Sequence, residues 1–234
     1  MKQHLNWKNE EEGSITFLED DEAVFTADVF LTGEEEAEFR IQDIVFLEKN
    51  AENGKISKKV IQKVTKYLLE CFRLLWAEGL EEVALVEPCG TILAEILDST
   101  EVVDLAYKEY MMKRCLPVQK TTDCGQSTLK LTKEEQGFCC ENAEHTFFCR
   151  LLEYGQEAPG ENCFYLFEVE VSEKVRNQGI ATACLEELFR FLSAKTPTVI
   201  YLQVGSYNEP AVHLYEKLGF TIEEELRYYG YGEE

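Results

Sequence analysis

The chain has 234 residues, of which 45% are hydrophobic and 12% aromatic, so it can bury a core and does not have the composition of a disordered chain. Its formal net charge is −22, from 45 acidic and 23 basic residues, which argues against nucleic-acid or anionic-membrane binding and favours a cationic ligand or simply solubility. No apolar run approaches the ~18 residues of a membrane span, and the polar start, Met1–Glu12, lacks the apolar stretch of a secretory signal, so we expect a soluble cytoplasmic protein.

The first half of the chain alternates strand-like and helix-like segments. In chain order it predicts strands at Ile15–Leu18, Val24–Phe25 and Val29–Leu31, a longer strand from Phe39 to Leu47, a helix from Val60 to Leu75, a strand at Val83–Val86, a helix from about Thr91 and a strand at Val102–Val103. The long helix is indicated by apolar residues that recur at every third or fourth position.

The second half repeats this order of elements. It predicts strands at Leu129–Leu131, Thr146–Phe148, Leu151–Leu152 and Phe164–Val171, a helix from Ala181 to Leu192, a strand at Val199–Leu202, a helix from Asn208 and a strand at Thr221–Ile222. The repeated order favours an internal duplication over chance recurrence of ordinary α/β elements. We therefore predict two domains, residues 1–120 and 121–234, joined by the polar, turn-rich segment Pro117–Ser127.

The nine cysteines do not form a recognisable framework. No Cys-x-x-Cys pair occurs, and no histidine lies at zinc-ligand spacing from a cysteine pair. Their number is odd, and several lie in apolar runs. We therefore predict free thiols, mostly buried, and no metal site.

One turn in the second half has the features of a phosphate site. A strand, a short loop and a helix follow one another between Val169 and Thr182, with small residues at Gly179 and Ala181. The first N–H groups of a helix have no partner inside it and carry partial positive charge, so this turn can hold a phosphate, with Arg176 as a cation at its rim. Turns of this kind are common, and this one is neither a Walker loop nor a GxGxxG loop.

A second motif lies downstream of this loop. Asn208-Glu209-Pro210-Ala211 has the pattern of a helix start, and Gly219 the pattern of a helix end. Together with Arg176-Asn177-Gln178-Gly179-Ile180-Ala181, the segment from Asn208 to Phe220 resembles the GCN5-related N-acetyltransferase (GNAT) superfamily. The resemblance covers about half of the chain, Thr128 to Gly232.

The resemblance implies a fold and a co-substrate, acetyl-CoA, without a metal. The fold is an α/β (α+β type) tandem of two GNAT-like domains, each a mixed, mostly antiparallel twisted sheet flanked by helices. In the second domain a splayed strand pair forms the acetyl-CoA site. The residues implied in acetyl-CoA binding are Val169, Val171, Arg176, Asn177, Gln178, Gly179, Ile180, Ala181, Thr182 and Asn208.

The resemblance also implies direct attack of an amine on the thioester, with Tyr215 giving a proton to the departing thiolate. A phenol with a pKa near ~10 is a competent donor to a thiolate with a pKa near ~8.5. The alternative is that Tyr215 only packs one face of its helix beside Leu214 and Leu218. A strand N–H near Val169 would steady the oxyanion.

The sequence offers two candidates for the base that takes the amine's proton. Glu168 and Glu170 alternate with Phe167, Val169 and Val171, so both should face one side of the strand, either toward the reacting centre or simply toward solvent. Some GNAT relatives carry a glutamate five residues before the motif asparagine. This chain has Gln203 there, which cannot accept a proton.

The first half departs from the family pattern. It lacks Arg-x-x-Gly-x-Ala, and alignment on the shared elements puts Gly90 at the place of Asn208 and Leu97 at the place of Tyr215. Gly54-Lys55 is a poor candidate for a phosphate contact. We therefore predict a GNAT-like domain without its catalytic residues.

The sequence is compatible with three functions. The first is an N-acetyltransferase that acts on a small cationic amine. The second is the same reaction on a protein amine, and the third is an acyl-CoA-binding regulatory or structural module with little turnover. We expect acetyl-CoA and an amine as partners, no nucleic acid and no membrane, and a monomer or homodimer.

Overall fold

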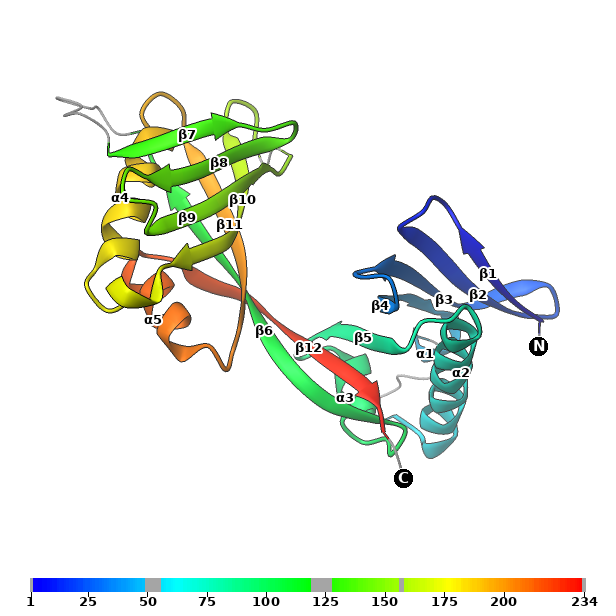
Figure 1. Cartoon of the computed structure of the whole chain (residues 1–234). Coiled ribbons are helices and arrows are strands. Elements are labelled where there is room, and N and C mark those ends of the chain that lie inside the picture. The colour runs from blue at the N-terminus through cyan, green and yellow to red at the C-terminus, as the bar shows by residue number, and fades with distance from the viewer. Residues whose placement is uncertain (1, 49–55, 119–127, 156–157, 233–234) are drawn as a thin grey trace. The chain divides into compact units, whose positions relative to one another are not determined.

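A computed structural model of the chain describes residues 2–48, 56–118, 128–155 and 158–232. They form two compact units: Met1–Lys108 with Glu225–Glu234, and Glu109–Glu224 (Figure 1). Each unit has the same order of elements, a run of strands followed by helix, strand, helix and strand, so the predicted tandem is confirmed. Within the described residues, no helix is both long and apolar enough to cross a membrane.

The first unit contains one sheet with the strand order β1-β2-β3-β4-β5-β12-β6. Its elements are β1 (Lys2–Trp7), β2 (Glu12–Glu19), β3 (Glu22–Leu31), β4 (Glu36–Ile44), α1 (Val45–Glu48), α2 (Lys58–Ala77), β5 (Glu82–Pro88), α3 (Ile92–Leu97), the start of β6 (Val103–Leu116) and the end of β12 (Thr221–Tyr231). Strands β4 and β5 are parallel, and the other pairs whose register is known are antiparallel.

Helix α2 covers the core of the first unit. Ser57 caps it, since its hydroxyl accepts a hydrogen bond from the Val60 N–H (3.4 Å). Its apolar positions recur at helical spacing, and Val64, Leu68 and Leu75 have no exposed surface. They pack against the alternate buried residues of β2, β3 and β4.

The second unit repeats this plan with the strand order β7-β8-β9-β10-β11-β6-β12. Its own elements are β7 (Leu129–Lys133), β8 (Gly137–Asn142), β9 (Phe147–Glu153), β10 (Asn162–Val171), the short 3-10 helix η2 (Glu173–Val175), α4 (Ile180–Leu192), β11 (Thr198–Gly205) and α5 (Glu209–Lys217). Helices α4 and α5, yellow and orange in Figure 1, pack their buried residues into one core with the sheet.

The two halves exchange their last strands. In the first unit, β12 pairs antiparallel with β5, from Leu226 opposite Pro88 to Tyr229 opposite Leu85. In the second unit, β6 pairs antiparallel with β11, from Leu116 opposite Thr198 to Glu109 opposite Gly205. The compact units therefore do not follow the predicted division at residues 120 and 121. Most of the predicted linker, residues 119–127, lies outside the described residues.

Several predicted strand limits need correction. The segment Val45–Glu48 is the helix α1, not the end of a strand, because a short unbroken apolar run does not distinguish the two. The pair Val24–Phe25 and Val29–Leu31 belongs to one strand, β3, since Ala27 continues the alternation of buried residues. Strands β1 and β8 were not predicted, because their polar and cysteine-rich sequences give a weak β signal.

Candidate functional site

The parallel strands of the second unit separate along their length. Pairing of β10 with β11 runs from Asn162 opposite Thr198 to Tyr165 opposite Tyr201. Beyond this point β10 continues to Val171 and keeps its pairing with β9 on the other side. The two strands therefore open a gap between residues 166–171 and 202–205, as expected for a splayed pair.

A β-bulge in β10 re-aims the side chains beside this gap. The register with β9 shifts between Phe167, opposite Arg150, and Glu170, opposite Phe148, and Glu168 has a φ of 49°. Cross-strand partners share a face, so Phe167 and Glu170 both lie on the face away from the helices. The expectation that Phe167 alternates with Glu170 is therefore wrong, because the bulge adds one residue.

The bulge leaves the peptide groups of Val169 and Val171 directed into the gap. The Ser172 N–H donates to the Thr146 carbonyl on the β9 side (2.9 Å). Peptide groups alternate in direction along a strand, so those of Val169 and Val171 point to the opposite edge. There the Val171 carbonyl accepts a hydrogen bond from Arg176 Nε (3.1 Å).

The loop from β10 to α4 has the conformation of an anion site. Asn177 and Gly179 have φ values of 61° and 79°, and Gly179 is the residue before the first helical turn. A Cβ at Gly179 would meet nothing within 4 Å, so glycine is needed here for its backbone angle. The first helical bond runs from Ala183 N–H to the Gly179 carbonyl, which leaves the N–H groups of Ile180 and Thr182 without intrahelical acceptors.

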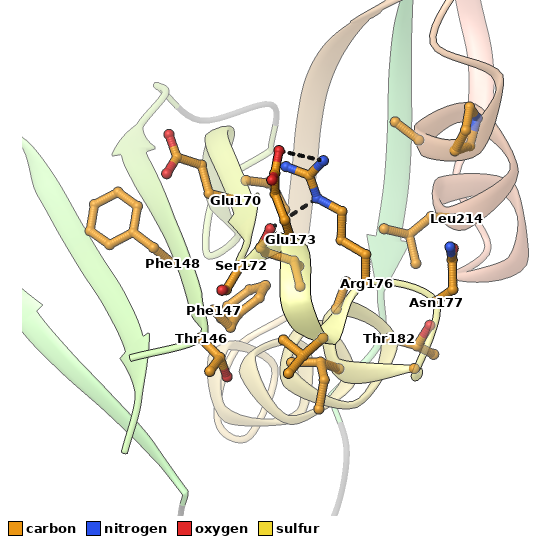
Figure 2. A pocket seen from close by; sticks show the side chains of 18 of the residues that line it. Thr146, Phe147, Phe148, Glu170, Ser172, Glu173, Arg176, Asn177, Thr182 and Leu214 are labelled. Atoms are coloured by element: carbon orange, nitrogen blue, oxygen red, sulfur yellow. Dashed lines mark hydrogen bonds and ion pairs between the residues drawn. The ribbon is translucent and has the colours of Figure 1, made fainter. Parts of the chain in front are cut away.

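Arg176 adds the cation of this loop. Besides Val171, it contacts the Glu173 carboxylate, with 3.7 Å between Nη1 and Oε1. Both side chains are exposed, so this ion pair is weak and easily replaced by a stronger anion. Figure 2 shows the Arg176 side chain extended toward Glu173, with Asn177, Thr182 and Leu214 grouped on another side of the cavity.

Helix α5 supplies the opposite wall. Asn208 caps it, and its side-chain oxygen accepts a hydrogen bond from the Ala211 N–H (3.3 Å). Tyr215, two turns further on, is 7% exposed, and its ring lies 5.7 Å from that of Phe220. Burial, with a smaller effect of the neighbouring Cys149, raises the pKa of Tyr215 to about 12, so the phenol stays protonated at neutral pH.

These elements enclose a cavity of about 1180 Å³. The predicted site residues on its wall are Val169, Glu170, Val171, Arg176, Asn177, Gly179, Ile180, Ala181, Thr182, Asn208 and Tyr215. Two predicted residues are not on the wall. Glu168 contacts Arg150 (3.3 Å), and the Gln178 side chain donates to the Lys174 carbonyl (3.2 Å).

Several other residues around the cavity were not predicted as site residues. Lys217, His145 and Phe148 also line it. Gln203 donates a side-chain hydrogen bond to the carboxylate of Glu109, which lies on the exchanged strand β6. Glu109 was not predicted because it precedes every motif of the second half in the sequence and reaches the site only through the strand exchange.

The first unit lacks these features where it is described. Its counterpart of α5 is α3, which Thr91 caps through a hydrogen bond from the Ala94 N–H (3.0 Å). Alignment of the two N-caps, Thr91 and Asn208, places the C-cap Asp98 where α5 carries Tyr215, one residue beyond the predicted counterpart, Leu97. Gly54-Lys55 lies outside the described residues.

Comparison with known proteins agrees with the geometry of the second half. Residues 113–220 match the acetyltransferase (GNAT) family. This half of the chain is a GNAT domain. The matched region contains the splayed strands, the loop before α4 and the helix α5, and it begins within β6.

One known acetyltransferase is similar in sequence to part of this chain. A mycothiol acetyltransferase of Corynebacterium kroppenstedtii is 28% identical over 75 residues, which cover 32% of this chain and 21% of that protein. The match thus spans about a fifth of the length of that relative.

Two solved structures extend the likeness to nearly the whole chain. A GCN5-related N-acetyltransferase from Sphaerobacter thermophilus has a TM-score of 0.61 at 12% identity, with 97% of this chain and 82% of that chain covered. A tandem GNAT protein from the clavulanic acid biosynthesis pathway has a TM-score of 0.54 at 8% identity, with 95% and 83% covered. At such identities the likeness establishes the fold, two GNAT-like domains in one chain.

Proposed function

We propose that the GNAT domain transfers an acetyl group from acetyl-CoA to the amine of a small cationic acceptor. The observation that carries this proposal is the cavity of about 1180 Å³, in which the open edge of β10, the start of α4 and one face of α5 meet. Each of these elements offers a group suited to one part of acetyl-CoA or to one step of the transfer.

The start of α4 suits the pyrophosphate of CoA. The left-handed residues Asn177 and Gly179 turn the loop so that successive N–H groups, from about residue 177 to Thr182, are available to an anion. The helix dipole adds partial positive charge, and Arg176 is close enough to exchange Glu173 for a phosphate oxygen.

The open edge of β10 suits the pantetheine arm. The peptide groups of Val169 and Val171 point into the gap and can pair with its amides, much as an added strand would. Asn208 lies on the opposite wall, where its side chain can bond the arm from the other side. Val171 first has to release Arg176, which pyrophosphate binding would favour.

The chemistry is a direct transfer without a covalent enzyme intermediate. The amine nitrogen attacks the thioester carbonyl, and an N–H near Val169 stabilises the developing oxyanion. The protonated phenol of Tyr215 gives its proton to the departing thiolate. A carboxylate must deprotonate the incoming ammonium, and β10 offers two candidates, Glu168 and Glu170.

Charge supports a cationic acceptor. The chain carries a formal net charge of −22, which raises the local concentration of cations and disfavours nucleic acid. A protein amine and a CoA-binding module with little turnover are the competing functions. The binding module is supported by Gln203, an amide at the position where some relatives carry the base.

The test is release of CoA thiol from acetyl-CoA in the presence of single amines: spermidine, tyramine and a lysine-containing peptide. We expect thiol release with at least one small amine, matched by an acetylated product in the mass spectrum. Release only with the peptide would replace the small acceptor by a protein amine. Tight acetyl-CoA binding without release on any amine would favour the binding module.

A further inference from the structure

The carboxylate of Glu109 is held in place by the side-chain amide of Gln203. Gln203 Nε2 donates a hydrogen bond to a carboxylate oxygen of Glu109. The antiparallel register of β6 with β11 places Glu109 opposite Gly205 and Met111 opposite Gln203, so Glu109 and Gln203 are diagonal neighbours on one face. Strand β6 thus brings the Glu109 carboxylate next to Gln203, the position at which some relatives carry the base.

Glu109 is level with the reacting part of the gap. The last parallel pair before the gap is Tyr165 with Tyr201. From this pair we continue the residue count along β10 and β11 and allow one extra residue for the bulge. Residues 169–170 of β10 are then level with Gly205 of β11. Gly205 is the partner of Glu109, so the carboxylate lies one strand away across β11, level with the stretch of β10 whose N–H groups face the thioester in the proposed reaction.

Glu109 also lies on the face of the sheet from which an acceptor can approach. Leu202 and Val204 alternate with Gln203 and are buried against α4 and α5, so Gln203 and Glu109 point to the other face. On that face, no helix among the described residues of the unit packs on the strands. The cavity for acetyl-CoA is lined by residues of α4 and α5 and also by Glu170, which shares the face of Glu109, so the two substrates can meet at the gap.

Aromatic rings surround the approach to Glu109. Tyr165 lies 6.0 Å from Tyr154 and 6.3 Å from Phe167, measured between ring centroids. Burial first, and then the charge of Glu109 and the nearby Tyr154, raise the pKa of Tyr165 to about 12, which is consistent with Glu109 lying close to this ring. Aromatic faces beside a carboxylate form an environment that attracts organic ammonium ions.

We propose that Glu109, oriented by Gln203, binds the ammonium group of the acceptor and takes its proton. This rests on the proposed function. The R–NH₃⁺ group gives one proton to the carboxylate, and the neutral amine attacks the acetyl carbonyl as the C–N bond forms. The C–S bond breaks and the sulfur takes the proton of Tyr215. The nitrogen releases its second proton as the amide forms, which restores the phenol through solvent, and the proton on Glu109 passes to solvent.

The test compares an amine that needs a base with one that does not. Tyramine is a cation at pH 7.5, whereas aniline is neutral and requires no deprotonation before attack. For Glu109→Gln we expect kcat/KM with tyramine to fall on the order of 10²-fold or more, with a much smaller change for aniline. Acetyl-CoA affinity, measured by calorimetry, should not change. Glu135→Gln removes an exposed charge from the turn between β7 and β8 and should retain wild-type rates.

Raising the pH provides a second readout. The other titratable groups on the same face include Tyr154, Tyr165, Tyr201, Cys139, Glu168, Glu170, Arg150 and Lys113. Lys113 lies over the Tyr201 ring (5.2 Å), and Glu168 pairs with Arg150. The tyramine rate of Glu109→Gln should recover as the pH approaches that at which the tyramine amine is itself unprotonated, which a purely structural defect would not produce. Equal losses with both amines, or full tyramine activity in the variant, would overturn the role of Glu109. Thiol release by neither protein with any amine would overturn the transfer reaction itself.

Discussion

Replacing Tyr215 by phenylalanine separates acid catalysis from packing. The ring is 7% exposed and lies against Phe220, and phenylalanine keeps this contact. We expect the free energy of unfolding to change by less than about 1 kcal/mol. The lost hydroxyl should instead lower kcat.

The size of the loss follows from the raised pKa of Tyr215, about 12. At pH 8 all but about one phenol in 10⁴ is protonated, so the acid form is always available. Transfer to a thiolate with a pKa near ~8.5 is, however, uphill by roughly 3.5 units, about 5 kcal/mol. A weak acid contributes toward the lower end of the usual range, so we expect kcat to fall about 10²-fold, or about 2.7 kcal/mol of barrier.

The assay is steady-state thiol release with saturating acetyl-CoA, together with calorimetric titration of acetyl-CoA. Tyr231→Phe, an exposed tyrosine of the first unit, is the matched control and should not change either measurement. Unchanged kcat in Tyr215→Phe would refute the proton donor. Loss of acetyl-CoA affinity would show instead that the hydroxyl acts in binding. The wild-type rate should show no alkaline loss from this phenol below about pH 11, given its raised pKa.

Three further predictions concern stability and are measured by chemical denaturation. Gly179→Ala should cost about 1–2 kcal/mol because of its φ of 79°, whereas Gly230→Ala, also in open space but without a positive φ, should cost nothing; equal effects would contradict the backbone argument. Leu188→Ala, fully buried in the core of the second unit, should cost about 2–5 kcal/mol, and a smaller loss would mean that the core closes around the cavity. Hydrogen bonds from Lys63 and Tyr67 lower the pKa of Glu19, so the stability that Glu19 contributes is present above the unfolded pKa and is lost as the pH falls through the folded pKa. Glu19→Gln should therefore be slightly less stable than the wild type at pH 7 and equal to it in acid. A difference in stability that persists in acid would exclude this cause.

The parts of the structure that sequence predicted well depend on local patterns. Asn208 lies before a helix start and caps α5, and the spacing of apolar residues placed both long helices. The conformation of Gly179 also follows from a local need, since glycine adopts a positive φ readily. The parallel, splayed pair β10 and β11 came from the family resemblance and is present in the structure.

The parts that sequence did not predict depend on contacts between distant residues. Nothing near Leu226 or Pro88 indicates that they pair, so the strand exchange has no local signal. The bulge at Glu168 depends on the register with β9, which moves Phe167 to an unexpected face. Glu109 reaches Gln203 only because of the exchange, and a search confined to the second half of the sequence would miss it.

Calorimetric titration with acetyl-CoA tests the central claim most directly. The wild-type protein is compared with a variant that combines Arg176→Ala and Gly179→Glu, which removes the cation and places a carboxylate at the start of α4. We predict one binding site per chain in the wild type and no binding in the variant, while Glu135→Gln binds as the wild type does. Two sites, or equal binding by the variant, would contradict a single acetyl-CoA site in the GNAT domain, and no binding by the wild type would contradict the transferase.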